Sequence, residues 1–214
     1  MLSTDKSVRL ANRLLRVIER HSNAHPAMSI SRERTLERTN KFINDAQNYM
    51  ITYKERSKER KEGLGAVSDL EDALRSFVPM ISNIYPHLKI NLTNLTGTTP
   101  DDTLTFTDIM MEEVQMQPDF ETNTMAKDIM NNVSTAWQTA MKEWTEYENA
   151  DSNFKAASEA LNTSKALFHG ELTMMRRTLA AVIGRTHPDV RKLTVQSSTT
   201  KDIDDPPENP TPAI

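Results

Sequence analysis

The sequence predicts an all-α fold, either an antiparallel helical bundle or a long coiled-coil hairpin, built from two duplicated long-helix units. Apolar residues recur at spacings of three and four over most of the chain, which is the period of an amphipathic helix. The 214 residues include only five glycines, too few for the turns of a parallel sheet. No proline lies between residues 119 and 187. Long helices are therefore expected in both halves of the chain.

The N-terminal segment, residues 1–28, is predicted to be one amphipathic helix that serves as an arm. Between residues 4 and 21, apolar and basic side chains occupy opposite halves of the helical wheel. The apolar half contains Val8, Leu10, Ala11, Leu14, Leu15, Val17 and Ile18, and the basic half contains Lys6, Arg9, Arg13, Arg16 and Arg20. Asn23 and Pro26 should end this helix, and Ser29 or Ser31 would then be the N-cap of the next one.

Residues 29–90 form the first predicted helical unit. One apolar register contains Leu36, Ile43, Met50, Leu64 and Val78, and the other contains Ala46, Tyr53, Val67, Leu74 and Ile81. The pattern weakens at Ser57 and Arg60, where Gly63 and Gly65 could break the helix into a hairpin, or a long helix could continue. Pro79 should kink the surrounding helix, because its ring clashes with the carbonyl four residues earlier.

Residues 91–118 are predicted to be a connector. The stretch from 85 to 118 is rich in threonine, β-branched residues and proline, and it shows no sustained helical period. A connector of this length without structure of its own is unusual in a compact domain. We therefore expect it to pack along the bundle or to contact a partner.

The second predicted helical unit, residues 119–193, has the strongest periodicity in the chain. One heptad register is apolar throughout: Ala126, Val133, Ala140, Tyr147, Phe154, Leu161, Phe168, Met175 and Val182. Its companion register is apolar at the ends and polar in the middle: Met130, Trp137, Trp144, Asp151, Ser158, Lys165, Leu172 and Leu179. Either a single helix of about 90 Å or a hairpin that turns between Asn149 and Asn153 is consistent with this pattern.

The two units share a motif at a fixed offset. The segment Arg75–Lys89 aligns with Arg177–Arg191, and both end in an aromatic or histidine residue, a proline, one variable residue, an aliphatic residue and a basic residue. Duplication explains this match better than chance. Pro86 and Pro188 would stop their helices, and Leu88 and Val190 could fold back on the last turn.

The residues that usually carry catalysis are absent or scattered. The chain has no cysteine and no motif for nucleophilic hydrolysis or nucleotide binding. Its five histidines do not cluster along the sequence, and His169 and Glu171 lie on different helix faces. His21 and His25 have the spacing of a ligand pair, but the helix should end between them. We expect no enzyme activity, no cofactor, no metal and no small-molecule substrate.

Charge is unevenly distributed along the chain. Residues 1–62 contain 14 Lys/Arg against 8 Asp/Glu, whereas residues 100–160 contain 3 against 13. The arginine face of the first helix could therefore pair with acidic side chains while its apolar face docks on another helix. The predicted interaction residues are Arg9, Arg13, Arg16, Arg20, Leu14, Leu15 and Ile18, together with Trp137 and Trp144 as stacked layers of a helix interface.

The remaining expectations concern the tail, the location and the role of the protein. Residues 194–214 are rich in proline and polar residues and should be extended. No secretory signal or membrane-spanning stretch is present, so a cytoplasmic protein is expected. The first hypothesis is a non-enzymatic scaffolding bundle that self-associates into a homo-oligomer or filament. The alternatives are a monomeric adaptor for a partner helix or peptide and, less favoured, a membrane or nucleic-acid binder using the arginine face.

Overall fold

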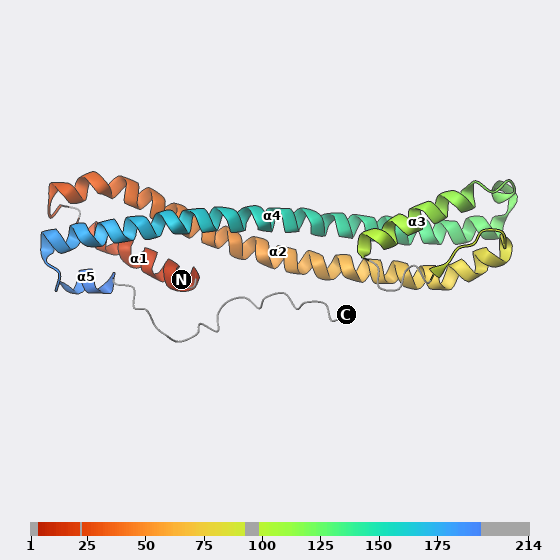
Figure 1. The fold of residues 1–214 in the computed structure, drawn as a ribbon, viewed down its shortest axis with the longest axis horizontal. Helices are drawn as coiled ribbons and strands as arrows, with labels where there is room; N and C mark the ends of the chain where they lie inside the picture. Colours follow the sequence, from red (N-terminus) through yellow and green to blue (C-terminus); the bar gives the residue numbers. More distant parts are fainter. Residues whose placement is uncertain (1–3, 22, 93–98, 194–214) are drawn as a thin grey trace. The chain divides into compact units, whose positions relative to one another are not determined.

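The computed structural model describes residues 4–21, 23–92 and 99–193, and these ranges contain helices and no strand (Figure 1). The helices are α1 (Thr4–His21), α2 (Pro26–Ile84), α3 (Pro100–Gln115), the 3-10 helix η2 (Phe120–Thr122), α4 (Thr124–Ile183) and α5 (Pro188–Lys192). The predicted all-α class is confirmed for these residues. The predicted tail, 194–214, lies outside them.

Helices α2 and α4 run without interruption over 59 and 60 residues. Of the alternatives left open by the sequence, an uninterrupted helix is therefore correct in both places, and the hairpin between Asn149 and Asn153 and the break at Gly63 and Gly65 are wrong. Asn149 and Asn153 are exposed on α4, where turn-forming side chains are tolerated because water satisfies them. The predicted N-cap at Ser29 or Ser31 is also wrong, since α2 already begins at Pro26, a residue suited to a first helical turn.

The chain divides into two compact units, and both long helices contribute to each of them. One unit comprises Met1–Ile51 and Lys155–Ile214, and the other comprises Thr52–Phe154. We call them the basic unit and the acidic unit, for the charges described below. Each unit has its own hydrophobic core, and all the buried residues of one core come from the same unit.

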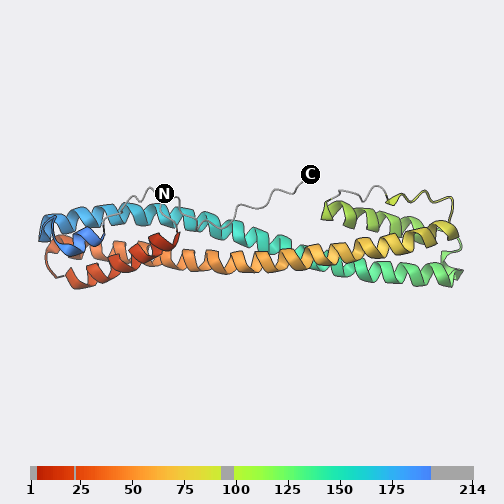
Figure 2. The same cartoon turned by 90° about the horizontal axis from the view of Figure 1, so that it is seen from below.

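In the basic unit, α1 and α5 pack with the first part of α2 and the last part of α4 (Figures 1 and 2). Phe42 and Phe168 stack at its centre, with ring centroids 4.9 Å apart and planes 8° from parallel. Arg38 of α2 lies one turn before Phe42 and reaches Glu171, which follows Phe168 on α4. Since the contact positions ascend along α2 as they descend along α4, the two helices are antiparallel here.

In the acidic unit, α3 covers the end of α2 and the start of α4 (Figure 2). The prediction that this region lacks helical structure is wrong between residues 100 and 115. Thr99 and Asp102 form a reciprocal capping box and Pro100 occupies the first turn, so the helix start is fully specified locally. Tyr53 and Arg56 of α2 contact Phe154 and Asp151 of α4, which gives an antiparallel pair in this unit too.

Burial along α4 follows the predicted heptad pattern. No residue of either predicted register is exposed, and Ala126, Val133, Ala140, Phe168 and Met175 are completely inaccessible to solvent. Along α2 the agreement is poorer, because Met50 and Leu64 are exposed although the pattern placed them inside. Leu88 and Val190 both pack against the core of their own unit, as the shared motif predicts.

Two glycines of α2 test how closely the long helices approach each other. A Cβ on Gly63 would lie 3.2 Å from the backbone oxygen of Glu143 and 3.3 Å from the Trp144 ring, whereas a Cβ on Gly65 would meet nothing within 4 Å. We expect Gly65→Ala to raise the free energy of unfolding by about 0.5–1 kcal/mol, the helix-propensity gain. Gly63→Ala should raise the free energy of unfolding by less than this, or lower it, because α4 must move to make room for the added methyl group. Urea denaturation followed by circular dichroism compares them, and an equal gain at both positions would contradict the close approach.

Candidate interaction surfaces

The arginine face of α1 lies at the surface of the basic unit. Arg9, Arg13 and Arg16 are exposed, and their guanidinium groups make no hydrogen bond or ion pair with any other described residue. Spacings of four and three place them on one side of the helix. We call these three residues the α1 arginine face.

The apolar half of α1 is not available to another molecule. Leu14 and Ile18 are completely buried in the core of their own unit, and Leu15 is half-buried at its margin. The apolar face of α1 packs on other helices of the same unit, so these residues anchor α1 to its own chain. Burying a leucine or isoleucine side chain favours the docked helix by about 1.5–3 kcal/mol.

Arg20 differs from the other predicted arginines because it is already paired. Its Nη1 donates to both carboxylate oxygens of Asp189, at 3.1 and 2.9 Å, and His21 Nε2 lies 2.9 Å from Asp189 Oδ2. Lys192 Nζ lies 3.7 Å from Asp189 Oδ1. The Asp189 side chain is only 4% exposed. The hydrogen bond with His21 and the charge of Arg20 hold the pKa of this carboxyl below its usual value, against the effect of burial.

Asp189 and the two neighbouring histidines have the residue types of a metal site. Ligand atoms of His21, His187 and Asp189 all lie within 4.8 Å of one another. However, His187 Nδ1 accepts a hydrogen bond from the Asp189 backbone N–H at 3.2 Å and caps α5, while Arg20 and Lys192 already bring positive charge to Asp189. A cation would have to displace these partners. The geometry favours an ion-pair cluster that fastens α1 to α5.

The sequence did not reveal this cluster, because its members are far apart in the chain. By spacing, His21 pairs only with His25, and no local pattern joins it to His187 or Asp189. The local sequence His-Pro-Asp does indicate the start of α5. Pro188 is its first residue, His187 is its N-cap, and Asp189 lies in its first turn.

A second buried carboxylate, Glu171, joins α2 to α4 within the basic unit. Arg38 Nη1 lies 2.6 Å from its Oε1, Arg34 Nε lies 3.1 Å away, and the Thr35 hydroxyl donates to Oε2 at 3.2 Å. His169 faces elsewhere, with its Nε2 3.4 Å from Ser7 Oγ. Burial and the charge of Lys165 lower the pKa of His169. As their helix positions predict, His169 and Glu171 do not form a pair.

The predicted tryptophans lie where α4 packs against α3, and each donates a hydrogen bond to α3. Trp137 Nε1 donates to the Leu104 carbonyl at 3.0 Å, and Trp144 Nε1 donates to Asp101 Oδ1 at 2.8 Å. Both rings are half-buried against the core of the acidic unit. These two residues therefore belong to the packing between α3 and α4 within one chain.

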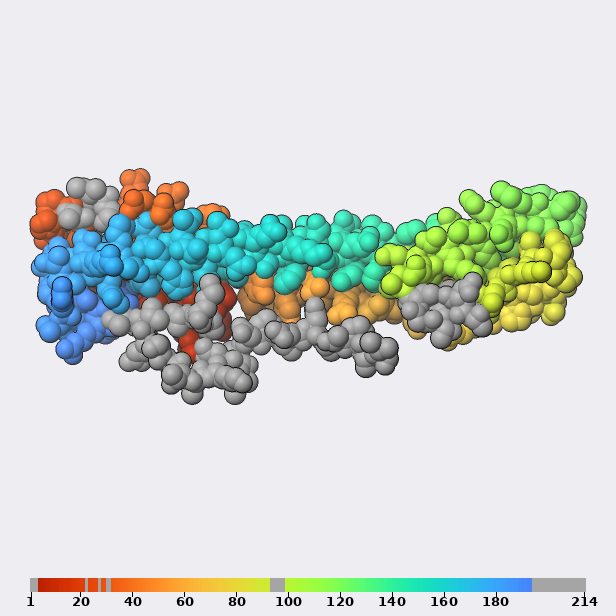
Figure 3. Space-filling view, viewed as in Figure 1, coloured from red at the N-terminus to blue at the C-terminus, as the bar shows by residue number. Residues whose placement is uncertain are grey.

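Helix α3 lies at the surface of its unit (Figure 3), and its exposed side carries acidic and apolar residues. Asp108, Glu112 and Glu113 are exposed, and their carboxylates make no hydrogen bond or ion pair with any other described residue. On the same side Ile109 is 51% exposed, and Met116, which caps the helix, is 77% exposed. We call these five residues the α3 acidic face.

Comparison of the chain with protein-family models, with curated proteins and with solved structures gave no match. Among the described residues, none of the helices is both long and apolar enough to span a bilayer.

Proposed function

We propose that this chain is a non-enzymatic structural protein that self-associates, with the basic unit of one copy bound to the acidic unit of the next. The observation that carries this proposal is the separation of charge between the units. Residues 1–51 and 155–214 contain 17 Lys/Arg and 12 Asp/Glu, whereas residues 52–154 contain 9 Lys/Arg and 18 Asp/Glu. Opposite charges on separate units favour contacts between copies and disfavour contacts between like units.

The α1 arginine face and the α3 acidic face are the two surfaces that best complement each other. Each presents three charges without a partner among the described residues, spaced along one side of a helix of similar length. Ile109 and Met116 add exposed apolar area to the acidic face, and the half-buried Leu15 adds some to the margin of α1. Apolar area and matched charge together supply affinity and orientation.

This contact joins two different surfaces, so its geometry decides the size of the assembly. Repetition of a contact between unlike surfaces gives a ring when the rotation closes and a filament when it does not. If one pair of copies makes the contact twice, the product is a two-fold dimer instead. All three are homo-oligomers whose formation weakens as salt screens the charges.

The motif shared by residues 75–89 and 177–191 supports two related binding ends. In chain order, a short helix precedes a long one twice, as α1 with α2 and as α3 with α4. The repeated motif also makes an equivalent contact in each unit: His87 Nε2 lies 2.7 Å from Gln117 Oε1, and Asp189, at the matching position, bonds His21. If one ancestral unit was duplicated and its two descendants then acquired opposite net charges, the chain would have two complementary binding surfaces.

The proposal is tested by reversing charge on each face. We expect Arg9→Glu/Arg13→Glu/Arg16→Glu to weaken association about a hundredfold, because like charges would then meet across the interface at a cost of several kcal/mol. Asp108→Lys/Glu112→Lys/Glu113→Lys should do the same. The chain that carries both triple substitutions should assemble again. Light scattering over a range of protein concentration and salt measures the mass of each variant.

A matched control comes from α4 and the segment that follows it in the basic unit. Arg176→Glu/Arg177→Glu/Arg185→Glu changes the unit's charge by the same amount without touching α1, and it should leave association intact. Circular dichroism checks that every variant is folded. A wild-type chain that stays monomeric at low salt, as an adaptor would, or a doubly reversed chain that fails to recover, contradicts the proposal.

A further inference from the structure

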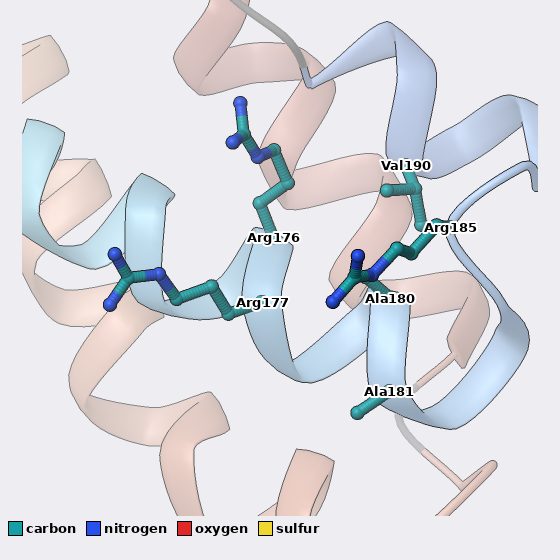
Figure 4. Close-up of a pocket in the computed structure, with 6 residues that line it drawn as sticks. All are labelled: Arg176, Arg177, Ala180, Ala181, Arg185 and Val190. Carbon is teal, nitrogen blue, oxygen red and sulfur yellow. The ribbon is translucent and has the colours of Figure 1, made fainter.

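A cleft in the basic unit is lined by three arginines and three small or medium apolar residues. Its volume is about 470 Å³, and it lies where α4 ends, the chain turns and α5 begins (Figure 4). Arg176 and Arg177 project from α4, and Arg185 projects from the segment that follows it. The apolar lining consists of Ala180, Ala181 and Val190.

The local sequence explains why this space is open. Gly184 has a φ of 93°, a left-handed conformation that favours glycine and ends α4 by reversing the chain. The His187 N–H then bonds to the Gly184 carbonyl at 3.2 Å, which brings Arg185 and α5 back along α4. Alanines at 180 and 181 are too small to fill the resulting gap.

The cleft gathers positive charge without a matching negative group. No acidic side chain is among its described lining residues, and the guanidinium groups of Arg176, Arg177 and Arg185 have no hydrogen bond or ion pair with any other described residue. The nearby Asp189 is already engaged by Arg20 and His21. Three like charges around one hollow repel each other, and a bound anion would relieve that repulsion.

We propose that this cleft binds an anion carrying two or more phosphate groups, from either a soluble polyphosphate or the headgroup of a polyphosphorylated lipid. The planar guanidinium fork matches phosphate oxygens. Figure 4 shows the three guanidinium groups spread around the cleft rather than converging on one point, so a single phosphate would not reach all of them. The volume is that of a small-molecule site. No aromatic ring is among the described lining residues, so nothing there favours stacking of a nucleobase.

Calorimetric titration of the full chain with tripolyphosphate tests this site. We expect saturable binding at near-physiological salt, at least about tenfold tighter than for orthophosphate. Arg176→Gln/Arg177→Gln/Arg185→Gln should lose at least about tenfold in affinity. The matched control, Arg9→Gln/Arg13→Gln/Arg16→Gln, removes the same charge from the same unit and should bind tripolyphosphate as the wild type does.

Vesicles distinguish the two sources of the phosphate groups. Wild-type binding to phosphatidylcholine vesicles that contain phosphatidylinositol bisphosphate, lost in the cleft variant and absent with charge-matched phosphatidylserine, indicates a lipid headgroup. Binding of tripolyphosphate without vesicle binding indicates a soluble ligand. The proposal is overturned if neither tripolyphosphate nor the vesicles bind saturably. It is also overturned if the cleft variant and the α1 control lose affinity equally, because that result would reflect net charge alone.

Discussion

Phe168→Ala should strongly destabilise the basic unit, because it removes one of the two stacked rings in the core of that unit. Phe168 and Phe42 are both completely buried and stack at a centroid distance of 4.9 Å. Truncating a buried phenylalanine costs about 3–5 kcal/mol, because transfer energy is lost and a cavity remains. That is a large part of the roughly 5–15 kcal/mol that stabilises a typical domain. Urea denaturation followed by circular dichroism measures the change.

Tryptophan fluorescence separates the response of the two units. Both tryptophans of the chain, Trp137 and Trp144, belong to the acidic unit. We expect Phe168→Ala to shift the circular dichroism transition by more than the fluorescence transition. The matched control is Leu167→Ala, one position earlier on α4, where the side chain is 41% exposed and the cost should be below about 1 kcal/mol. Equal losses at 167 and 168 would contradict the register in which α4 packs.

The long helices were predictable where the apolar pattern is long and uninterrupted. Along α4, the positions from Ala126 to Val182 recur every seven residues, and the structure leaves none of them exposed. A signal repeated over so many turns outweighs local turn formers such as Asn149 and Asn153. On α2 the pattern is weaker around the two glycines, and Leu64 in that stretch is exposed.

Helix α3 was missed because threonines take the place of apolar residues in its buried face. Thr103 and Thr107 are completely buried, and the Thr107 hydroxyl donates to the Thr103 carbonyl at 2.7 Å. A hydroxyl satisfied by its own helix can be buried at low cost. A search for hydrophobic spacing does not count such positions. The capping box of Thr99 and Asp102 was a usable signal for the helix start.

The pairing of distant residues was beyond the sequence. Asp189 meets Arg20 and His21 across more than 160 positions, and nothing in either local pattern specifies that meeting. The arginine face of α1 was predictable, because its charges are set by the helical wheel. The packing of its apolar side inside the same unit was not predictable, because periodicity shows that a face is buried but does not show which partner buries it.

Asp189→Asn should lower the free energy of unfolding by about 2 kcal/mol at neutral pH, because a buried carboxylate then no longer accepts charge-assisted hydrogen bonds from Arg20 and His21. The substitution keeps the shape of the side chain, so the loss reports the charge. Urea denaturation at pH 7 measures it. Asp69→Asn, at an exposed position of α2 without a described partner, is the control and should change stability little.

The pH dependence of this difference gives an independent check. The pKa of Asp189 is lower in the folded chain than its ordinary value, so the unfolded state takes up its proton first as pH falls. The stabilisation is therefore complete above the ordinary aspartate pKa of about 4 and is lost as pH falls through the lowered folded value. The gap between wild type and Asp189→Asn should be present at about pH 5 and should narrow below about pH 4, as Asp189 takes up a proton. A gap that does not narrow at low pH would mean that the charge of Asp189 does not stabilise this cluster, and that α1 is fastened to α5 by other contacts.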